Sequence, residues 1–195
     1  NIKEAEIMDY ILTARSLGKR YKNFKTLNDF SIHVPKGAIY GTENNDPGIG
    51  RCRRRMGAVV ETPSIYQDMT AEDNLKEQYR IIGLPSFDSI PELLRLVGLE
   101  NTGKKKAKHF SLGMKQRLGI AIALAGNPDF LILDEPVNGL DPQGIIEVRE
   151  LILKLNREKG ITFLISSHIL DELSRLATHY GFIDSGHMVK EMSAA

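Results

Sequence analysis

The stretch FLILDEP, residues 130–136, places two carboxylates directly after four apolar residues. A short apolar run of this kind predicts a buried strand, and open α/β sheets bind ligands at the carboxyl ends of such strands. Asp134 is therefore placed to hold Mg²⁺, directly or through water, and Glu135 could orient a water for attack on a terminal phosphate. The alternative for this stretch alone is a strand that ends in a solvated acidic turn.

A second apolar run, ITFLISSH, ends at His168. A histidine in this place could donate a hydrogen bond to a phosphate oxygen and help to hold the attacking water. Taken alone, His168 is more simply explained as a core histidine whose hydrogen bonds are satisfied.

A third stretch, HFSLGMKQRLGIAIALAG, predicts a helix with Ser111 as its N-cap and Gly113 in its first turn. The unpaired amides and the dipole of a helix start favour an anion. By itself, ordinary capping is the simpler explanation of this pattern.

The remaining apolar patterns predict the elements that position these residues. Three short runs between residues 10 and 41 predict β structure, with a polar turn at 19–25, and a further strand ends at Glu61. The strands at 130–134 and 161–166 enclose a predicted helix, which indicates a parallel sheet buried between helix layers. Helices are predicted at 71–82, 89–99, 142–159 and from Ser111 onward, and closing strands at 180–185 and 187–192.

These elements predict an α/β core with an antiparallel β edge at the N-terminus and a helical insert near residues 70–108. We expect one domain over residues 8–195 and set residues 1–7 aside as non-native. With 26 basic and 25 acidic side chains, the chain carries no bulk charge that would favour nucleic acid. No apolar run reaches the roughly 18 residues of a membrane span. The single cysteine, Cys52, excludes an internal disulfide and fits a reducing compartment.

Taken together, FSLGMKQRL, FLILDEP, NGLDP and ISSH resemble, in order and spacing, the motifs of the ATP-binding cassette (ABC) ATPases. The resemblance covers residues 10–190. It implies a P-loop NTPase-like α/β fold: a mainly parallel sheet between helices, an N-terminal antiparallel β subdomain and a helical signature subdomain at about 70–120.

The resemblance also implies a role for each matching residue. FLILDEP resembles the Walker B strand, with Asp134 on Mg²⁺ and Glu135 as general base, and His168 matches the switch histidine. Ser111 and Gly113 would bind the γ-phosphate of ATP held by a second copy, and Asp141 would link the two sites of this nucleotide-sandwich dimer. Tyr21 would stack on adenine, although a tyrosine in a turn more often packs locally.

Three features depart from the family pattern. Leu112 and Met114 stand where the signature usually has glycine and glutamine. Glu61 stands where most members have a glutamine that senses Mg²⁺ and contacts the membrane partner, although a carboxylate is also a competent Mg²⁺ ligand. Glu61 and the residues after it, with SLGMKQRL, are similar to the bacitracin and lantibiotic export or immunity subgroup.

The third departure is the phosphate loop. The pattern G-x-x-x-x-G-K-[ST] should follow the strand AIYG, whose last residue, Gly41, would enter the nucleotide site, but the sequence contains no such pattern. Loop, helix and next strand would amount to roughly 30 residues. We expect that this segment belongs between Gly41 and Thr42; the alternative is a protein that lacks it.

The resemblance implies an ATP-hydrolysing transporter subunit at the inner face of the cell membrane, in the cytoplasm. Its partners would be an integral membrane permease and a second copy, its cofactors ATP and Mg²⁺, and its cargo a peptide antibiotic or similar substrate. A different interpretation is a catalytically inactive structural partner in a heterodimeric transporter. A soluble cassette that acts on ribosomes or DNA is a third, which the single short cassette disfavours.

Overall fold

The computed structural model describes residues 10–21, 24–35, 55–60, 63–184 and 187–194, with backbone alone for the first two of these ranges. Three residues that the sequence singled out, Gly41, Cys52 and Glu61, lie outside the described residues. The same holds for the predicted position of the phosphate loop.

The centre of the molecule is a three-stranded parallel sheet in the order β3 (Met56–Val60), β4 (Phe130–Asp134) and β5 (Thr162–Ser166). The strands are in register: Gly57 pairs with Leu131, which pairs with Phe163. Paired residues of neighbouring parallel strands point to the same face, and alternate residues point to opposite faces. This register therefore decides which strand-end side chains meet.

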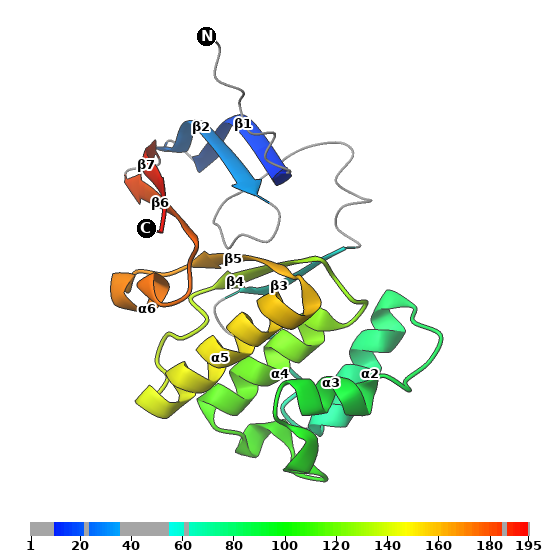
Figure 1. Ribbon diagram of the computed structural model, residues 1–195. Coiled ribbons are helices and arrows are strands. Elements are labelled where there is room, and N and C mark those ends of the chain that lie inside the picture. The colour runs from blue at the N-terminus through cyan, green and yellow to red at the C-terminus, as the bar shows by residue number, and fades with distance from the viewer. Residues whose placement is uncertain (1–9, 22–23, 36–54, 61–62, 185–186, 195) are drawn as a thin grey trace.

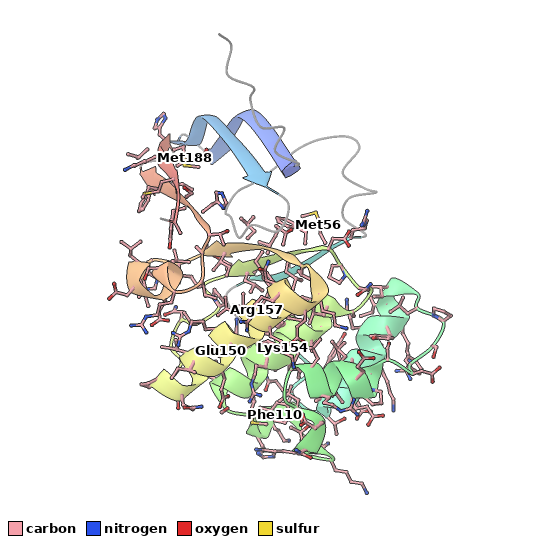
Figure 2. All side chains as sticks on the ribbon, viewed as in Figure 1. Met56, Phe110, Glu150, Lys154, Arg157 and Met188 are labelled. Atoms are coloured by element: carbon pink, nitrogen blue, oxygen red, sulfur yellow. The ribbon has the colours of Figure 1, made fainter. Side chains whose placement is uncertain are left out.

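Helices α4 (Leu112–Leu124) and α5 (Pro142–Lys159) cover one face of this sheet (Figure 1). Gly57 allows the close contact, because a Cβ there would lie 2.1 Å from the carbonyl oxygen of Ala123 on α4. Figure 2 shows Glu150, Lys154 and Arg157 along the outer side of α5, opposite its buried apolar residues. The core beneath the sheet is apolar and closely packed, with Leu118, Leu131, Leu133, Ile152, Leu155 and Phe163 among its fully buried side chains.

On the other face of the sheet, the residues near the carboxyl end of β3 are open to solvent. The helices α4 and α5 lie on the first face, and Val60 at the end of β3 is 65% exposed. Ala58, on the same face of β3, is exposed as well. Within the described part of the chain, the sheet is therefore covered fully on one side and in part on the other.

The predicted helical insert is confirmed. It comprises α2 (Ala71–Ile82), α3 (Ile90–Leu96) and the short 3₁₀ turns Glu100–Thr102 and Ala107–His109, and it packs beside α4 through buried residues such as Leu75, Ile90 and Leu99. Thr70 caps α2 as predicted, since its hydroxyl accepts a hydrogen bond from the Asp73 amide at 3.1 Å. In Figure 2, Phe110 marks the end of this subdomain from which α4 departs.

The four lysines of the segment at 104–108 are exposed. Lys108 pairs with Asp68 at 2.8 Å, and this ammonium lowers the pKa of the Asp68 carboxyl. Backbone hydrogen bonds from Ala107 and Lys108 to the carbonyls of Met69 and Gln67 hold the segment against the start of the insert.

The N-terminal strands β1 (Tyr10–Tyr21) and β2 (Phe24–Pro35) form an antiparallel pair. The polar turn predicted at 19–25 was too long: Lys19 pairs with Leu27, and Arg20 with Lys25. Backbone hydrogen bonds extend such a ladder whether or not its side chains are apolar.

The last described elements of the chain are α6 (Leu170–Ser174) and the hairpin of β6 (His179–Asp184) and β7 (His187–Ser193). None of the described helices is long and apolar enough to span a bilayer.

Candidate functional site

Asp134 and Ser166 lie side by side at the carboxyl edge of the sheet. They are the last residues of β4 and β5, and they are paired in register, as Val60 and Asp134 are on the other side. Their side chains therefore share the face opposite α4 and α5. The Ser166 hydroxyl donates a hydrogen bond to Oδ1 of Asp134.

Glu135 leaves the strand in a left-handed backbone conformation, with a φ of 48°. Few residues other than glycine adopt this conformation without a local reason. Its amide donates to the carbonyl oxygen of Ser166 at 3.1 Å and to the hydroxyl of the same serine at 3.2 Å. These two acceptors hold the backbone turn at Glu135.

His168 binds the Glu135 carboxylate through two of its atoms. Its backbone nitrogen donates to Glu135 Oε1 at 3.0 Å, and its ring Nδ1 lies 2.9 Å from the same oxygen. The Glu135 side chain is 22% exposed and the His168 side chain 65%. His168 is thus no core histidine, and Glu135 is held by neighbours rather than lying free in a solvated turn.

Open space lies next to this pair. Ser166, Ser167 and His168 line one side of a cavity of about 350 Å³, and α6 and β6 supply its other walls, including His179 and Tyr180.

The donor set at this edge fits Mg²⁺. Asp134 offers a carboxylate next to a hydroxyl, both hard oxygen donors, and Glu135 Oε2 is buried without a hydrogen-bond partner among the described residues. The described residues contain no group of three or more metal-binding side chains. Mg²⁺ typically takes one or two carboxylates, with waters and substrate phosphates completing its shell. Asp134 would hold the ion; Glu61, the other predicted ligand, lies outside the described residues.

The helix start that was predicted to bind phosphate, at Ser111, forms a second group with the start of α5 at Asp141. Ser111 caps α4 as predicted, because its hydroxyl accepts from the Met114 amide at 3.2 Å. Asp141 caps α5 in the same way, through the Gly144 amide at 3.1 Å. The two starts touch: a Cβ on Gly113 would lie 3.7 Å from the Cα of Gly144.

Within the described residues, no hydrogen bond or ion pair joins Ser111 or Asp141 to Asp134, Glu135 or His168. The structure therefore brings the predicted residues together in two separate groups. Leu112, which replaces the usual signature glycine, is 46% exposed and faces Gly139 in the loop before Asp141. Tyr21 ends β1 opposite Phe24, with its side chain outside the described part.

The sequence did not predict the role of Ser166 or the tertiary contacts of Arg117. Arg117 Nη1 donates to the carbonyl oxygens of Val97 and Gly98, both at 3.0 Å, and Nη2 lies 3.3 Å from Glu147 Oε2. This arginine joins the end of α3 to α5 across α4. Nothing in the local pattern around Ser166 marks it; its signal is its place opposite Asp134, which requires the register of two strands.

A parallel α/β sheet with an Asp–Glu pair at one strand end and a histidine bound to the glutamate at the next is the arrangement expected of a cassette that handles nucleoside triphosphates. The chain belongs to the ABC transporter family, whose model matches residues 27–138.

Among curated proteins, the chain is similar to bacitracin transport ATP-binding protein BcrA. It is 36% identical to the Enterococcus faecalis protein, and the match covers 96% of this chain and 70% of that protein. It is 40% identical to the Bacillus licheniformis protein, and the match covers 95% of this chain and 70% of that protein. Lantibiotic transport ATP-binding protein SrtF of Streptococcus pyogenes is 38% identical over 93% of this chain and 90% of that protein. The alignment with the E. faecalis protein spans 217 residues, more than the 195 of this chain.

Solved structures of ABC cassettes share the fold. CbiO1 of Clostridium perfringens, part of an ABC transporter complex, superposes with a TM-score of 0.82 at 22% identity, covering 95% of this chain and 89% of that one. The ATP-binding cassette MJ0796, in a dimeric post-hydrolysis state with ADP and phosphate, superposes with a TM-score of 0.77 at 19% identity, covering 94% and 98%. The expected fold class is confirmed.

Proposed function

We propose that the chain binds and hydrolyses ATP and so powers a transporter that exports a peptide antibiotic or a similar substrate. One observation carries the proposal: Glu135, a carboxylate at the end of β4, is bound by His168 at the end of β5, next to the Asp134–Ser166 pair. Such an edge positions a water and a metal-bound phosphate without any covalent intermediate.

Glu135, His168 and Asp134, at the carboxyl edge of the sheet, each have a defined role in this proposal. Glu135 accepts a proton from the attacking water or orients it, and the two bonds from His168 fix the direction of its carboxylate. His168 also reaches the solvent side, where its ring can contact the terminal phosphate. Mg²⁺, when bound through Asp134, neutralises phosphate charge.

The second group would act on ATP held by another copy of the chain. Ser111 and Gly113 present the start of α4 to a γ-phosphate, and Asp141 links the two sites from the adjoining start of α5. The separation of these residues from Asp134, Glu135 and His168 supports this arrangement. So does the dimeric state of the MJ0796 cassette, which has the same fold.

The transport role rests on the relatives. BcrA and SrtF are named as bacitracin and lantibiotic transport ATP-binding proteins. By analogy, this chain would dock on a separate integral membrane permease and work on the cytoplasmic face of the membrane. Tyr21, Gly41 and Glu61 would contribute adenine stacking, the entry to the phosphate loop and a further Mg²⁺ contact.

A second candidate is a non-catalytic partner in a heterodimeric transporter. The missing G-x-x-x-x-G-K-[ST] pattern favours it, because phosphate binding in this family resides largely in that loop. The bonded Glu135–His168 pair favours the catalytic proposal, since a chain without hydrolysis has no use for a fixed general base.

The deciding experiment compares the native protein with its Glu135→Gln variant. The amide keeps the size of the side chain but cannot act as a base, so turnover should fall by about 10²- to 10⁴-fold while ATP binding survives. Steady-state phosphate release and equilibrium binding of a fluorescent ATP analogue measure the two quantities. Turnover like wild type in the variant refutes the role of Glu135, and a native protein that binds no ATP supports the non-catalytic partner.

A further inference from the structure

Ser166 contacts both acidic residues of the site through a single hydroxyl group. Its hydrogen goes to Oδ1 of Asp134, and its oxygen accepts the amide hydrogen of Glu135 at 3.2 Å. A serine hydroxyl has one hydrogen to donate and two lone pairs to accept, so both bonds can exist at once. A third link, from the Glu135 amide to the Ser166 carbonyl oxygen at 3.1 Å, joins the same two residues through the backbone.

The sheet itself places Ser166 there. Asp134 and Ser166 are register partners at the ends of parallel strands, so their side chains leave the sheet on the same face. A hydrogen bond to a carboxylate is stronger than one between neutral groups, and it orients the acceptor. Among the described contacts, Asp134 uses only Oδ1, which leaves Oδ2 for a metal ion or its water.

The same hydroxyl also stabilises the turn at Glu135. A φ of 48° is unfavourable for glutamate and persists only where the surroundings hold it. The neighbouring serine does not contribute to this turn, because the Ser167 hydroxyl accepts from the Ile169 amide, two residues further along. His168 binds the other end of Glu135, its carboxylate.

We propose that Ser166 is a positioning residue that orients Asp134 toward Mg²⁺ and holds the backbone of Glu135 in the conformation that aims its carboxylate. This inference deepens the proposed function and rests on it. It assigns a role to a residue that carries no chemistry of its own and whose hydroxyl alone, rather than its bulk, matters.

The test is nucleotide binding to the native protein as a function of Mg²⁺ concentration, without reference to turnover. A fluorescent, non-hydrolysable ATP analogue is titrated in EDTA and then over a range of Mg²⁺ for wild type, Ser166→Ala and Ser166→Thr. Loss of a hydrogen bond to a metal ligand typically costs about 10- to 100-fold in metal affinity. We therefore expect Ser166→Ala to need about 10- to 100-fold more Mg²⁺ for half-maximal enhancement of binding.

Two comparisons separate positioning from general damage. Ser166→Thr keeps the hydroxyl and suits a strand end, so its Mg²⁺ requirement should stay near that of wild type. Ser174→Ala removes a hydroxyl that bonds only to the Asp171 carbonyl within α6, and it should match wild type in every condition. Binding in EDTA should be equal for all four proteins.

The outcomes are distinct. An unchanged Mg²⁺ requirement in Ser166→Ala overturns the inference, and so does equal impairment of Ser166→Thr or a loss of binding in EDTA. In each of these cases the ATPase proposal stands. A wild-type protein that binds no nucleotide under any condition refutes the ATPase proposal itself, and the inference falls with it.

Discussion

Oxygen Oε1 of Glu135 is bound twice by His168, at 3.0 Å from its backbone nitrogen and at 2.9 Å from its ring Nδ1. A carboxylate can only accept, so Nδ1 carries the hydrogen in this contact. Nε2 of the neutral ring is then an acceptor, and it donates to a phosphate only when the ring is protonated. The two residues are therefore joined as one unit, in which the histidine directs the carboxylate and the outer edge of its ring faces solvent.

This shared oxygen predicts that His168 and Glu135 are not independent. His168→Ala should slow ATP turnover by about 100-fold, because Glu135 loses its ring contact and the phosphate loses a partner. In the Glu135→Gln background the same substitution should cost little more, since groups that act as a unit are strongly non-additive. Steady-state phosphate release from the two single variants and the double variant measures this. Effects that multiply in full would show that the two residues act separately.

The position of this unit was predictable, but its contacts were not. FLILDEP and ITFLISSH each predict a strand end, so Asp134, Glu135 and His168 could be assigned from local apolar runs. Which side chains touch depends on the register between β4 and β5, and a shift of one residue would turn Ser166 to the other face. No local pattern encodes that register, which is why Ser166 escaped notice.

Local signals also account for the confirmed helices. Thr70 and Ser111 accept the hydrogen bonds that cap α2 and α4, and capping is a matter of a few neighbouring residues. The prediction of a turn at 19–25 was too long, because the side chains of KRYKNFK are polar and give no apolar signal for a strand. The backbone hydrogen bonds between β1 and β2 nevertheless continue into this segment. Arg117 reaches α3 and α5 through tertiary contacts that its own helix does not reveal.

Gly119 should be essential for packing the segment after β3 against α4. A Cβ at this position would come within 2.5 Å of Cβ and 2.7 Å of Cγ of Pro63, a buried ring that cannot rotate away. Gly119→Ala should therefore lower the free energy of unfolding by about 1–3 kcal/mol, although alanine is the better helix former. Urea unfolding measures the difference.

The matched control for Gly119 lies in the same helix. Gly113→Ala adds the same methyl group where its nearest neighbour would be 3.7 Å away, an ordinary contact. The fold should be at least as stable as wild type in this variant, since alanine replaces glycine in the first turn. If Gly119→Ala unfolds at the same urea concentration as Gly113→Ala, the close approach of Pro63 does not hold in solution.

Arg117 should contribute more to stability than an arginine on the surface. Arg117→Met keeps most of the apolar stem but removes the bonds to Val97, Gly98 and Glu147, at a cost of about 2 kcal/mol. The control is Arg80→Met on α2, where the arginine pairs with Glu77 and lies over the Phe87 ring in an exposed setting, and where the loss should stay below about 1 kcal/mol. Thermal or urea unfolding ranks the two. Equal losses would show that Arg117 does not join α3 to α5.

The intact mass of the protein made from its native gene should exceed 21.8 kDa. A phosphate loop with its helix and next strand, roughly 30 residues, would add about 3 kDa between Gly41 and Thr42. The 65% exposure of Val60 supports this expectation, because a parallel sheet of this family is normally covered on both faces. So does the alignment with the E. faecalis relative, which spans more residues than this chain has. Peptide mapping locates the excess, and a mass equal to 21.8 kDa would favour the non-catalytic partner over the ATPase.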